Sequence, residues 1–322
     1  MWTSFLATIL LLSIQSAHAL SYTFTTIDVP GASITAPDSL NDAGQIVGSF
    51  FDAAGSHGFL YAGGAFTTID VPGSQSTRLS GINDAGQIVG SFNDPAGTQH
   101  GFLYTGGVFT TFDVPGATST ALSGINNAGQ MVGSFSTLGQ PPLHGFLYTG
   151  GALVTIDVPP GNVNTAPNDI NDVAQVVGTS FIGVSHGFLY TSGVFSTIDV
   201  PGPWLVNDPG GINNAGQIVG TFASPGIVSH GYLHVGGAFT TTDFPGAIVT
   251  DLSDINNAGQ IVGRFSLEPD FNPPHGFLAI PATVSEPASP FILALGLLWI
   301  AALRRGKLTD RCSVIRPSRH GP

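Results

Sequence analysis

The chain has 322 residues, including 44 glycines and 23 prolines; 42% of its residues are hydrophobic and only 9% are charged. The apolar fraction excludes a disordered chain, and this much glycine and proline is typical of short strands joined by tight turns. Arg78 and Arg264 are the only basic residues before residue 304, whereas residues 20–284 contain eighteen Asp and Glu. Because nucleic-acid binding needs a basic footprint for the phosphates, we exclude nucleic acid as a partner.

The first predicted element is an N-terminal export signal. Residues 5–14 are apolar, and Ala17-His18-Ala19 follows them as a small-x-small cleavage pattern. The sequence therefore predicts a signal peptide over residues 1–19, with Ala17 and Ala19 at the cleavage site and the general secretion machinery as a partner. No Lys or Arg precedes the apolar stretch, so a short membrane anchor stays open as the alternative.

Residues 20–281 repeat one pattern six times. A Gly-Ile-Asn-Asp/Asn-Ala-Gly-Gln-Ile-Val-Gly segment is followed by His-Gly-Phe-Leu-Tyr and then by Phe-Thr-Thr-Ile-Asp-Val-Pro-Gly. The histidine recurs every 42 to 45 residues, as His57, His100, His144, His186, His230 and His275. A fixed period of this length indicates an array of identical supersecondary units.

Each unit contains four segments of strand length, which we name A to D in chain order. In the second unit, strand A leads into Gly81-Ile82-Asn83, and strands B, C and D are residues 87–92, 101–104 and 109–114. These segments are rich in β-branched and aromatic residues and are bounded by Gly, Asn, Asp or Pro. Apolar residues on both faces of strand B require that each sheet be covered on both sides.

The two ends of the array are complementary. A D-type strand at residues 24–29 precedes the first A strand, and the last unit ends with a C-type strand at residues 276–280. Pairing them would complete a last sheet and remove the exposed edges. We therefore predict an all-β fold: a six-bladed β-propeller of four-stranded repeats, closed by the N-terminal strand and followed by a C-terminal hydrophobic helix. An open β-solenoid is the alternative.

The repeated polar residues are predicted to be structural. Each of the six histidines lies in its own unit, so they cannot converge on a metal ion unless they line the central axis. The repeated aspartates occur singly beside turns, whereas calcium needs several oxygens from one compact loop, so we expect turn capping or solvation. The only cysteine is Cys312, which excludes an intrachain disulfide. No catalytic motif is present, and we expect no catalytic residue, metal or cofactor.

The units differ mainly in their B–C and D–A loops, which would project from one face of a propeller. Because loops on a rigid scaffold carry function, that face is the candidate binding surface. Its most distinctive members are Arg78, Trp204, Asp270 and Phe271. An exposed Trp204 could stack on a sugar ring, and the alternative is that it fills a gap between blades.

The C-terminal region after residue 281 has three parts. Residues 282–290 form a linker with Ser285-Glu286-Pro287, residues 291–303 are largely apolar, and residues 304–322 are a basic tail that begins with Arg304 and Arg305. A helix of thirteen residues would span roughly 20 Å, short of the ~30 Å hydrocarbon core, which favours a transient sorting helix. The arginines should lie on the cytoplasmic side.

Two families resemble parts of this chain. The repeat is similar to that of the HAF-type extracellular repeat proteins of bacteria, whose pattern is matched by Ile82, Asn83, Gly86, Val89, Gly90, His100, Phe102 and Leu103. The tail resembles the PEP-CTERM sorting signal, although Ser285 replaces its first proline and residues 308–322 extend beyond its usual end. These resemblances imply an exported protein of a Gram-negative bacterium, with exosortase as a partner.

The sequence thus predicts a protein that is transiently anchored in the inner membrane and then reaches the cell surface or extracellular matrix. Its propeller would be a non-enzymatic binding or adhesion scaffold, associated with extracellular polysaccharide. The alternative is a polysaccharide lyase or glycosidase with its site at the propeller axis, because propellers host both binders and catalysts.

Overall fold

The computed structural model describes residues 21–138, 140–159, 164–223, 228–268 and 274–282. These residues form twenty-four strands and no helix, which confirms the all-β prediction. Residues 1–281 make one compact unit and residues 282–322 a second. The predicted signal peptide, sorting motif, apolar helix and basic tail lie outside the described residues. Among the described residues, no helix has the length and apolar character needed to cross a membrane.

The strands form repeated four-stranded antiparallel sheets, as the sequence predicts. Three sheets follow the chain directly: β10 (Ser119–Ile125), β11 (Met131–Thr137), β12 (Gln140–Thr149) and β13 (Ala152–Thr155); β14 (Asn164–Ile170), β15 (Val176–Ile182), β16 (Val184–Thr191) and β17 (Val194–Thr197); β18 (Val206–Ile212), β19 (Ile218–Ala223), β20 (Ser229–Val235) and β21 (Ala238–Thr241). A fourth sheet combines β22 (Val249–Ile255), β23 (Ile261–Ser266) and β24 (His275–Pro281) with β1 (Tyr22–Thr26), the first strand of the chain.

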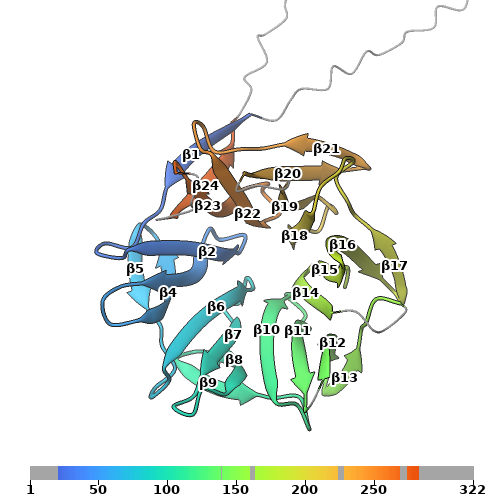
Figure 1. The fold of residues 1–322 in the computed structure, drawn as a ribbon. Helices are drawn as coiled ribbons and strands as arrows, with labels where there is room; N and C mark the ends of the chain where they lie inside the picture. Colours follow the sequence, from blue (N-terminus) through green and yellow to red (C-terminus); the bar gives the residue numbers. More distant parts are fainter. Residues whose placement is uncertain (1–20, 139, 160–163, 224–227, 269–273, 283–322) are drawn as a thin grey trace, which may run out of the picture. The chain divides into compact units, whose positions relative to one another are not determined.

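The remaining strands form two further four-stranded sets. They are β2 (Ile34–Leu40), β3 (Ile46–Phe51), β4 (Ser56–Ala62) and β5 (Ala65–Thr68), and β6 (Ser76–Ile82), β7 (Ile88–Asn93), β8 (Gln99–Thr105) and β9 (Val108–Phe112). A single parallel pair, Ser56 with Ser76, joins these sets into one eight-stranded sheet. Around a common centre, the A strands lie innermost and the D strands outermost, the radial arrangement of a β-propeller (Figure 1).

The sheets are held together by apolar residues between neighbours. Val89 of β7, for example, packs with Leu122 and Phe146 of the next sheet in the chain. Val262 of β23 packs in the same way with Ile46 of β3. The apolar residues on both strand faces, noted in the sequence, are therefore buried from two sides, and each sheet depends on its neighbours for a core.

Tight turns connect strands A and B in every unit. Gly86 adopts a φ of 73° between β6 and β7, in the left-handed region that glycine enters without strain. In the fourth unit Ala174 takes the equivalent place, with a φ of 59°. The turns at this end of the sheets are therefore uniform, and the A strands enter the centre at the same height.

The structure corrects two strand boundaries. Strand C begins earlier than predicted, so that His100 lies inside β8 and opposite Phe92, not before the strand. Strand D ends earlier, at Phe112 in the second unit. Beyond this point the backbone has other partners, since the amide of Val114 donates to the Thr120 hydroxyl at 3.0 Å, while the Asp113 carboxylate binds His100.

Candidate binding site at the centre of the sheets

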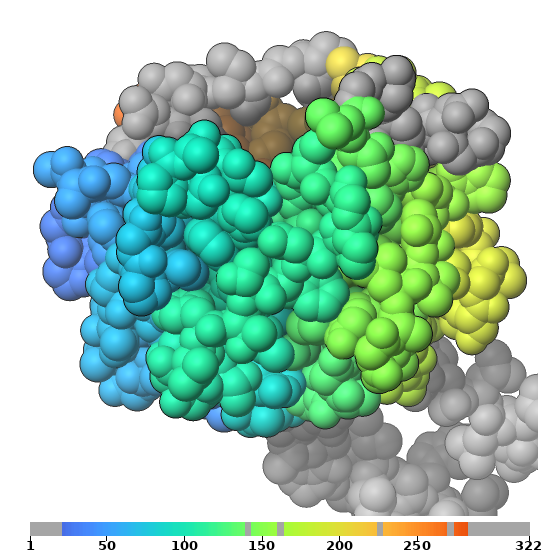
Figure 2. All heavy atoms as spheres, turned by 90° about the horizontal axis from the view of Figure 1, so that it is seen from below, coloured from blue at the N-terminus to red at the C-terminus, as the bar shows by residue number. Residues whose placement is uncertain are grey.

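The innermost strands surround an axial space that is wide at one end. A cavity of about 560 Å³ opens on the side of the B–C and D–A loops, and the upper surface in Figure 2 is hollowed there. The cavity size falls within the ~300–1,000 Å³ range of small-ligand sites. Most of the side chains that line it are polar: Asp38, Arg78, Ser80, Ser91, Gln99, Ser123, Ser134, Asn168, Asp208, Thr221, Ser229, Asp251, Ser253 and Arg264.

Two ion pairs lie in the cavity wall. Arg78 of β6 binds Asp38 of β2 through two parallel hydrogen bonds, from Nε to Oδ2 (3.1 Å) and from Nη2 to Oδ1 (2.7 Å). The Asp38 carboxylate raises the pKa of the Arg78 guanidinium. Arg264 donates from Nε to Oδ2 of Asp251 at 3.2 Å. Both arginines that precede residue 304 in the sequence therefore face one cavity.

A third carboxylate, Asp208 of β18, is held without an arginine partner of its own. It accepts hydrogen bonds from the Thr179 hydroxyl and from the Asn168 amide, the latter at 3.1 Å. Asp208 is exposed to the cavity. Partial loss of hydration among the surrounding protein groups raises its pKa, and the Asp251 charge adds to this, while its hydrogen bonds to Thr179 and Asn168 and the Arg264 charge oppose it. The cavity thus contains a carboxyl group that is held in its neutral form to a higher pH than usual.

Below the cavity the axis narrows around two buried acids. Asp254 is 6% exposed and accepts hydrogen bonds from Ser39 Oγ (2.7 Å) and the Leu40 amide (3.0 Å). Asp169 accepts from the Ile212 amide at 2.9 Å. Burial raises the pKa of Asp254 to about 8, with the Asp169 charge as a further cause, and burial raises the pKa of Asp169 to about 6. The two acids occupy space that Gly124 and Gly211 leave free of side chains.

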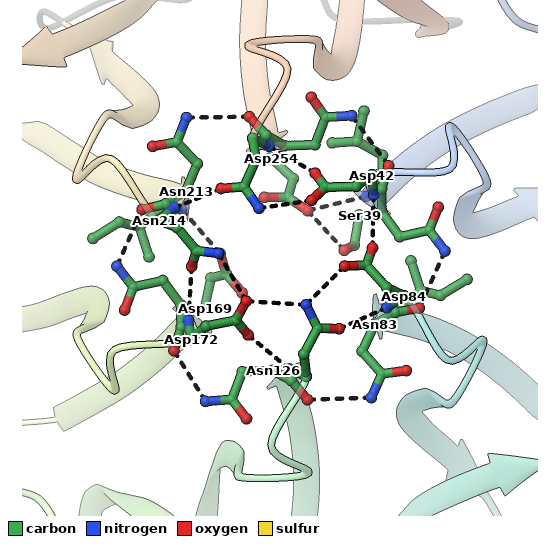
Figure 3. Close-up of a pocket in the computed structure, with 18 of the residues that line it drawn as sticks. Ser39, Asp42, Asn83, Asp84, Asn126, Asp169, Asp172, Asn213, Asn214 and Asp254 are labelled. Atoms are coloured by element: carbon green, nitrogen blue, oxygen red, sulfur yellow. Dashed lines mark hydrogen bonds between the residues drawn. The ribbon is translucent and has the colours of Figure 1, made fainter.

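At the opposite end, the A–B turns form a ring of hydrogen-bonded asparagines (Figure 3). Each asparagine amide nitrogen donates to the carbonyl oxygen of its counterpart in the next unit, at 3.0 to 3.2 Å. The series runs Asn41, Asn83, Asn126, Asn171, Asn213 and Asn256, and Asn256 donates to Asn41. The Asn of the repeated Gly-Ile-Asn segment therefore links every unit to its neighbour.

The residue after each of these asparagines forms a second ring, nearer to the axis (Figure 3). Its backbone amide donates to the side-chain oxygen of its counterpart in the next unit, at 2.8 to 2.9 Å. The members are Asp42, Asp84, Asn127, Asp172, Asn214 and Asn257. Asp and Asn both supply an acceptor oxygen, which explains why the sequence exchanges them between units.

The six repeated histidines lie away from the axis, each bound to a repeated aspartate. The His Nδ1 to Asp Oδ2 distances are 2.7 to 2.8 Å in all units. The pairs are His57–Asp70, His100–Asp113, His144–Asp157, His186–Asp199, His230–Asp243 and His275–Asp28. Among the described residues, no group of three or more His, Cys, Asp or Glu is placed to hold a metal ion.

The structure describes two of the four predicted ligand residues, and one of these two lines the cavity. Arg78 lines the cavity. Trp204 instead packs edge-on against Phe222, with ring centroids 4.7 Å apart, and its Nε1 donates to the Pro201 carbonyl at 3.1 Å. Asp270 and Phe271 lie outside the described residues, as do Ala17, Ala19, Ser285, Glu286, Pro287, Arg304 and Arg305.

Apart from Arg78, the charged residues on the strands themselves were not predicted from the sequence, because variation was sought in the loops. A signal was available in strand A. One position of that strand is Ala36, Ala121 or Ala166 in three units but Arg78, Asp208 or Asp251 in the other three. Its partner in strand B is Ser or Thr in every unit except the last, where it is Arg264. These departures from the repeat coincide with the cavity wall.

Comparison with known proteins gives the fold alone. No family model and no curated protein matches the chain. Among solved structures, TolB from Acinetobacter baumannii is 12% identical with a TM-score of 0.51, over 74% of this chain and 63% of TolB. A fucose-specific lectin from Aleuria aurantia (12% identity, TM-score 0.44, 75% of this chain and 90% of the lectin) and a Hadza microbial sialidase (9%, 0.49, 78% and 66%) are less similar in shape. At this identity, the likeness to TolB shows a shared fold.

Proposed function

We propose that the chain is an exported binding or adhesion scaffold of the cell surface or extracellular matrix, sorted by exosortase and associated with extracellular polysaccharide. The observation that carries the binding role is the polar axial cavity on the loop side of a rigid repeat array. The export and sorting roles rest on residues 1–19 and 282–322 of the sequence, which resemble a signal peptide and a PEP-CTERM tail.

We further propose that the propeller has six blades and is closed by its own ends. In this proposal β2–β5 and β6–β9 count as two blades, since one residue pair joins them. Support for closure comes from the antiparallel pairing of β1 with β24, in which Phe24 lies opposite Ala279. The asparagine series also supports it, because the last member donates to the first.

Sorting is tested by following the C-terminal tail in a bacterium that makes extracellular polysaccharide. Replacing Glu286 and Pro287 by alanine should leave the tail unprocessed and the protein in the membrane fraction. The control is an Asp310→Ala variant, which changes an acidic residue of the same tail outside the motif and should be processed normally. Normal trimming of the double variant would show that the sorting assignment is wrong.

A second candidate function, a polysaccharide-acting enzyme, has one observation in its favour. Asp208 and Asp251 lie in one cavity, and partial desolvation there raises the pKa of Asp208. Hydrolysis of a glycosidic bond uses a pair of carboxyl groups, one of which has a raised pKa and acts as the general acid. The purified protein should release no reducing ends from polysaccharides in the scaffold proposal. Release that disappears in Asp208→Asn would establish the enzyme instead.

A further inference from the structure

In a repeat protein, residues that hold the units together should recur, and residues with a single task should not. The asparagine rings and the histidine–aspartate pairs recur in every unit. The cavity wall does not follow this rule, because Arg78, Asp208 and Asp251 stand where other units have alanine. Alanine at the same strand position shows that the fold itself does not need these charges.

The charged residues of the cavity nearly balance one another. Asp38, Asp208 and Asp251 oppose Arg78 and Arg264, and each arginine is already bound to a carboxylate. An anionic ligand would meet the Asp38 and Asp251 carboxylates, and a cationic ligand would meet two guanidinium groups. Both would bring an unpaired charge into a partly desolvated space, which costs free energy. The cavity therefore favours a ligand without net charge.

Hydrogen-bonding capacity remains in the wall for such a ligand. The Arg78 side chain is 60% exposed, and its Nη1 has no hydrogen-bond partner among the described residues, because the Asp38 pair uses Nε and Nη2. The serine and threonine hydroxyls of the wall both donate and accept. A guanidinium group donates to a ligand hydroxyl and a carboxylate accepts from one, and such charge-assisted hydrogen bonds are stronger than neutral ones.

We infer that this cavity is a single asymmetric site for the end of a neutral oligosaccharide, with Arg78–Asp38 on one side and Asp208, Asp251 and Arg264 on the other. This inference rests on the proposed binding function and gives it a place and a ligand class. A neutral sugar carries many hydroxyls and no charge, as the wall requires. The charged residues come from only some of the units, so the ring has one such site and one bound orientation.

The repeat supplies the variants for the test. Arg78→Ala, Asp208→Ala and Asp251→Ala each install the residue that other units already have at that position, so the fold should tolerate them. Asp84→Asn is the matched control: it removes a carboxylate at the narrow end of the axis, where three other units have asparagine. The full-length purified chain is titrated calorimetrically with neutral tri- and tetrasaccharides of glucose, galactose and mannose and with uronic-acid oligosaccharides.

The expected result is saturable binding of at least one neutral oligosaccharide at one site per chain. Each of the three alanine variants should weaken that binding at least tenfold, and Asp84→Asn should leave it unchanged. Binding only to uronic-acid oligosaccharides, or equal binding by wild type and all three variants, would overturn the inference.

Co-sedimentation with the polysaccharide of the producing cells separates this result from failure of the proposed function. If wild type and the alanine variants sediment alike, the scaffold function stands and the axial site is wrong. If the wild type does not sediment at all, the scaffold function and the axial site are both wrong.

Discussion

Asp254 shows how one repeat position can acquire a new property. Three of the six units have glycine there, at Gly81, Gly124 and Gly211, whereas Asp254 places a carboxyl group in the narrow part of the axis. Burial raises its pKa to about 8, far above the ordinary value of 3.8. The protonated form is therefore preferred in the folded protein, and ionisation works against folding.

We predict that the free energy of unfolding falls as the pH rises from about 4 to about 8. The folded state binds more protons than the unfolded state in this window, because the folded pKa values of Asp254 and Asp169 are about 8 and about 6 against 3.8 unfolded. Asp254→Asn should flatten this slope, so that the stability of the variant relative to the wild type increases from pH 4 to pH 8, by up to about 1.4 kcal/mol for each unit by which folding raises the pKa of Asp254. Urea unfolding of wild type and variant at several pH values measures the free energy of unfolding. The same slope with pH in both proteins would contradict the prediction.

His100 shows the opposite case, a recurring residue that joins two strands. Its Nδ1 binds Asp113 at 2.8 Å, and its ring stacks on Phe92 with centroids 5.2 Å apart. The Asp113 hydrogen bond is the main cause that raises the pKa of His100. The contact therefore strengthens when the histidine is protonated.

We predict that His100→Asn lowers the free energy of unfolding by about 1 kcal/mol, the usual effect of one such hydrogen bond. The loss should be largest below the unfolded histidine pKa of 6.5 and should shrink as the pH rises through the higher folded value. Thermal unfolding of wild type and His100→Asn at pH 5.5 and at pH 8.5 measures this loss of stability. Unchanged stability together with lost ligand binding would show that the residue is not structural.

At the scale of the element, the glycine in the middle of each B strand has a packing cause. A Cβ on Gly133 would meet the Ala121 carbonyl oxygen and lie 3.0 Å from Phe146 Cζ. The aromatic ring of strand C lies over this glycine, so the pleat has no room for a side chain. Turn glycines such as Gly129 have a different cause, a positive φ of 73° with nothing within 4 Å of a Cβ.

Because the causes differ, replacing the two kinds of glycine by alanine should lower the stability of the protein by different amounts. Gly133→Ala should destabilise the protein by about 3 kcal/mol, because overpacking displaces backbone and ring. Gly129→Ala should cost about 1 kcal/mol, since Ala174 already occupies the equivalent turn position. Chemical denaturation of both variants gives the comparison, and equal losses would refute the packing explanation.

The elements were predictable to different degrees. Periodicity and turn residues were sufficient for the four strands of a unit, because glycine and proline mark the ends of strands. The start of strand C was missed, since the ladder pairs of His100 and Gln99 depend on strand B and not on their own propensity. Arg78 was identified as distinctive, but Asp208 was not, because the inward face of strand A emerges only when the sheets are arranged around a centre.

At the scale of the whole molecule, the pairing of the first strand with the last predicts tolerance to circular permutation. Joining Pro281 to Tyr22 through a short flexible linker and opening the chain between Gly106 and Gly107 keeps every strand pair. The permutant should unfold within about 5 °C of the parent. A permutant opened between Val89 and Gly90, inside β7, is the control and should not fold. Loss of folding in both would contradict closure through β1 and β24.

The pairing of Tyr22 with Pro281 also determines how the site is presented. Pro281 Cγ would lie 3.3 Å from a Cβ on Gly259, a residue of an A–B turn. Both ends of the described chain therefore leave on the turn side, whereas the axial cavity opens on the loop side. A tether or fusion partner attached at either end stands clear of the diffusion path into the cavity. Immobilisation through a short tether that begins at Pro281 should thus leave ligand access unobstructed.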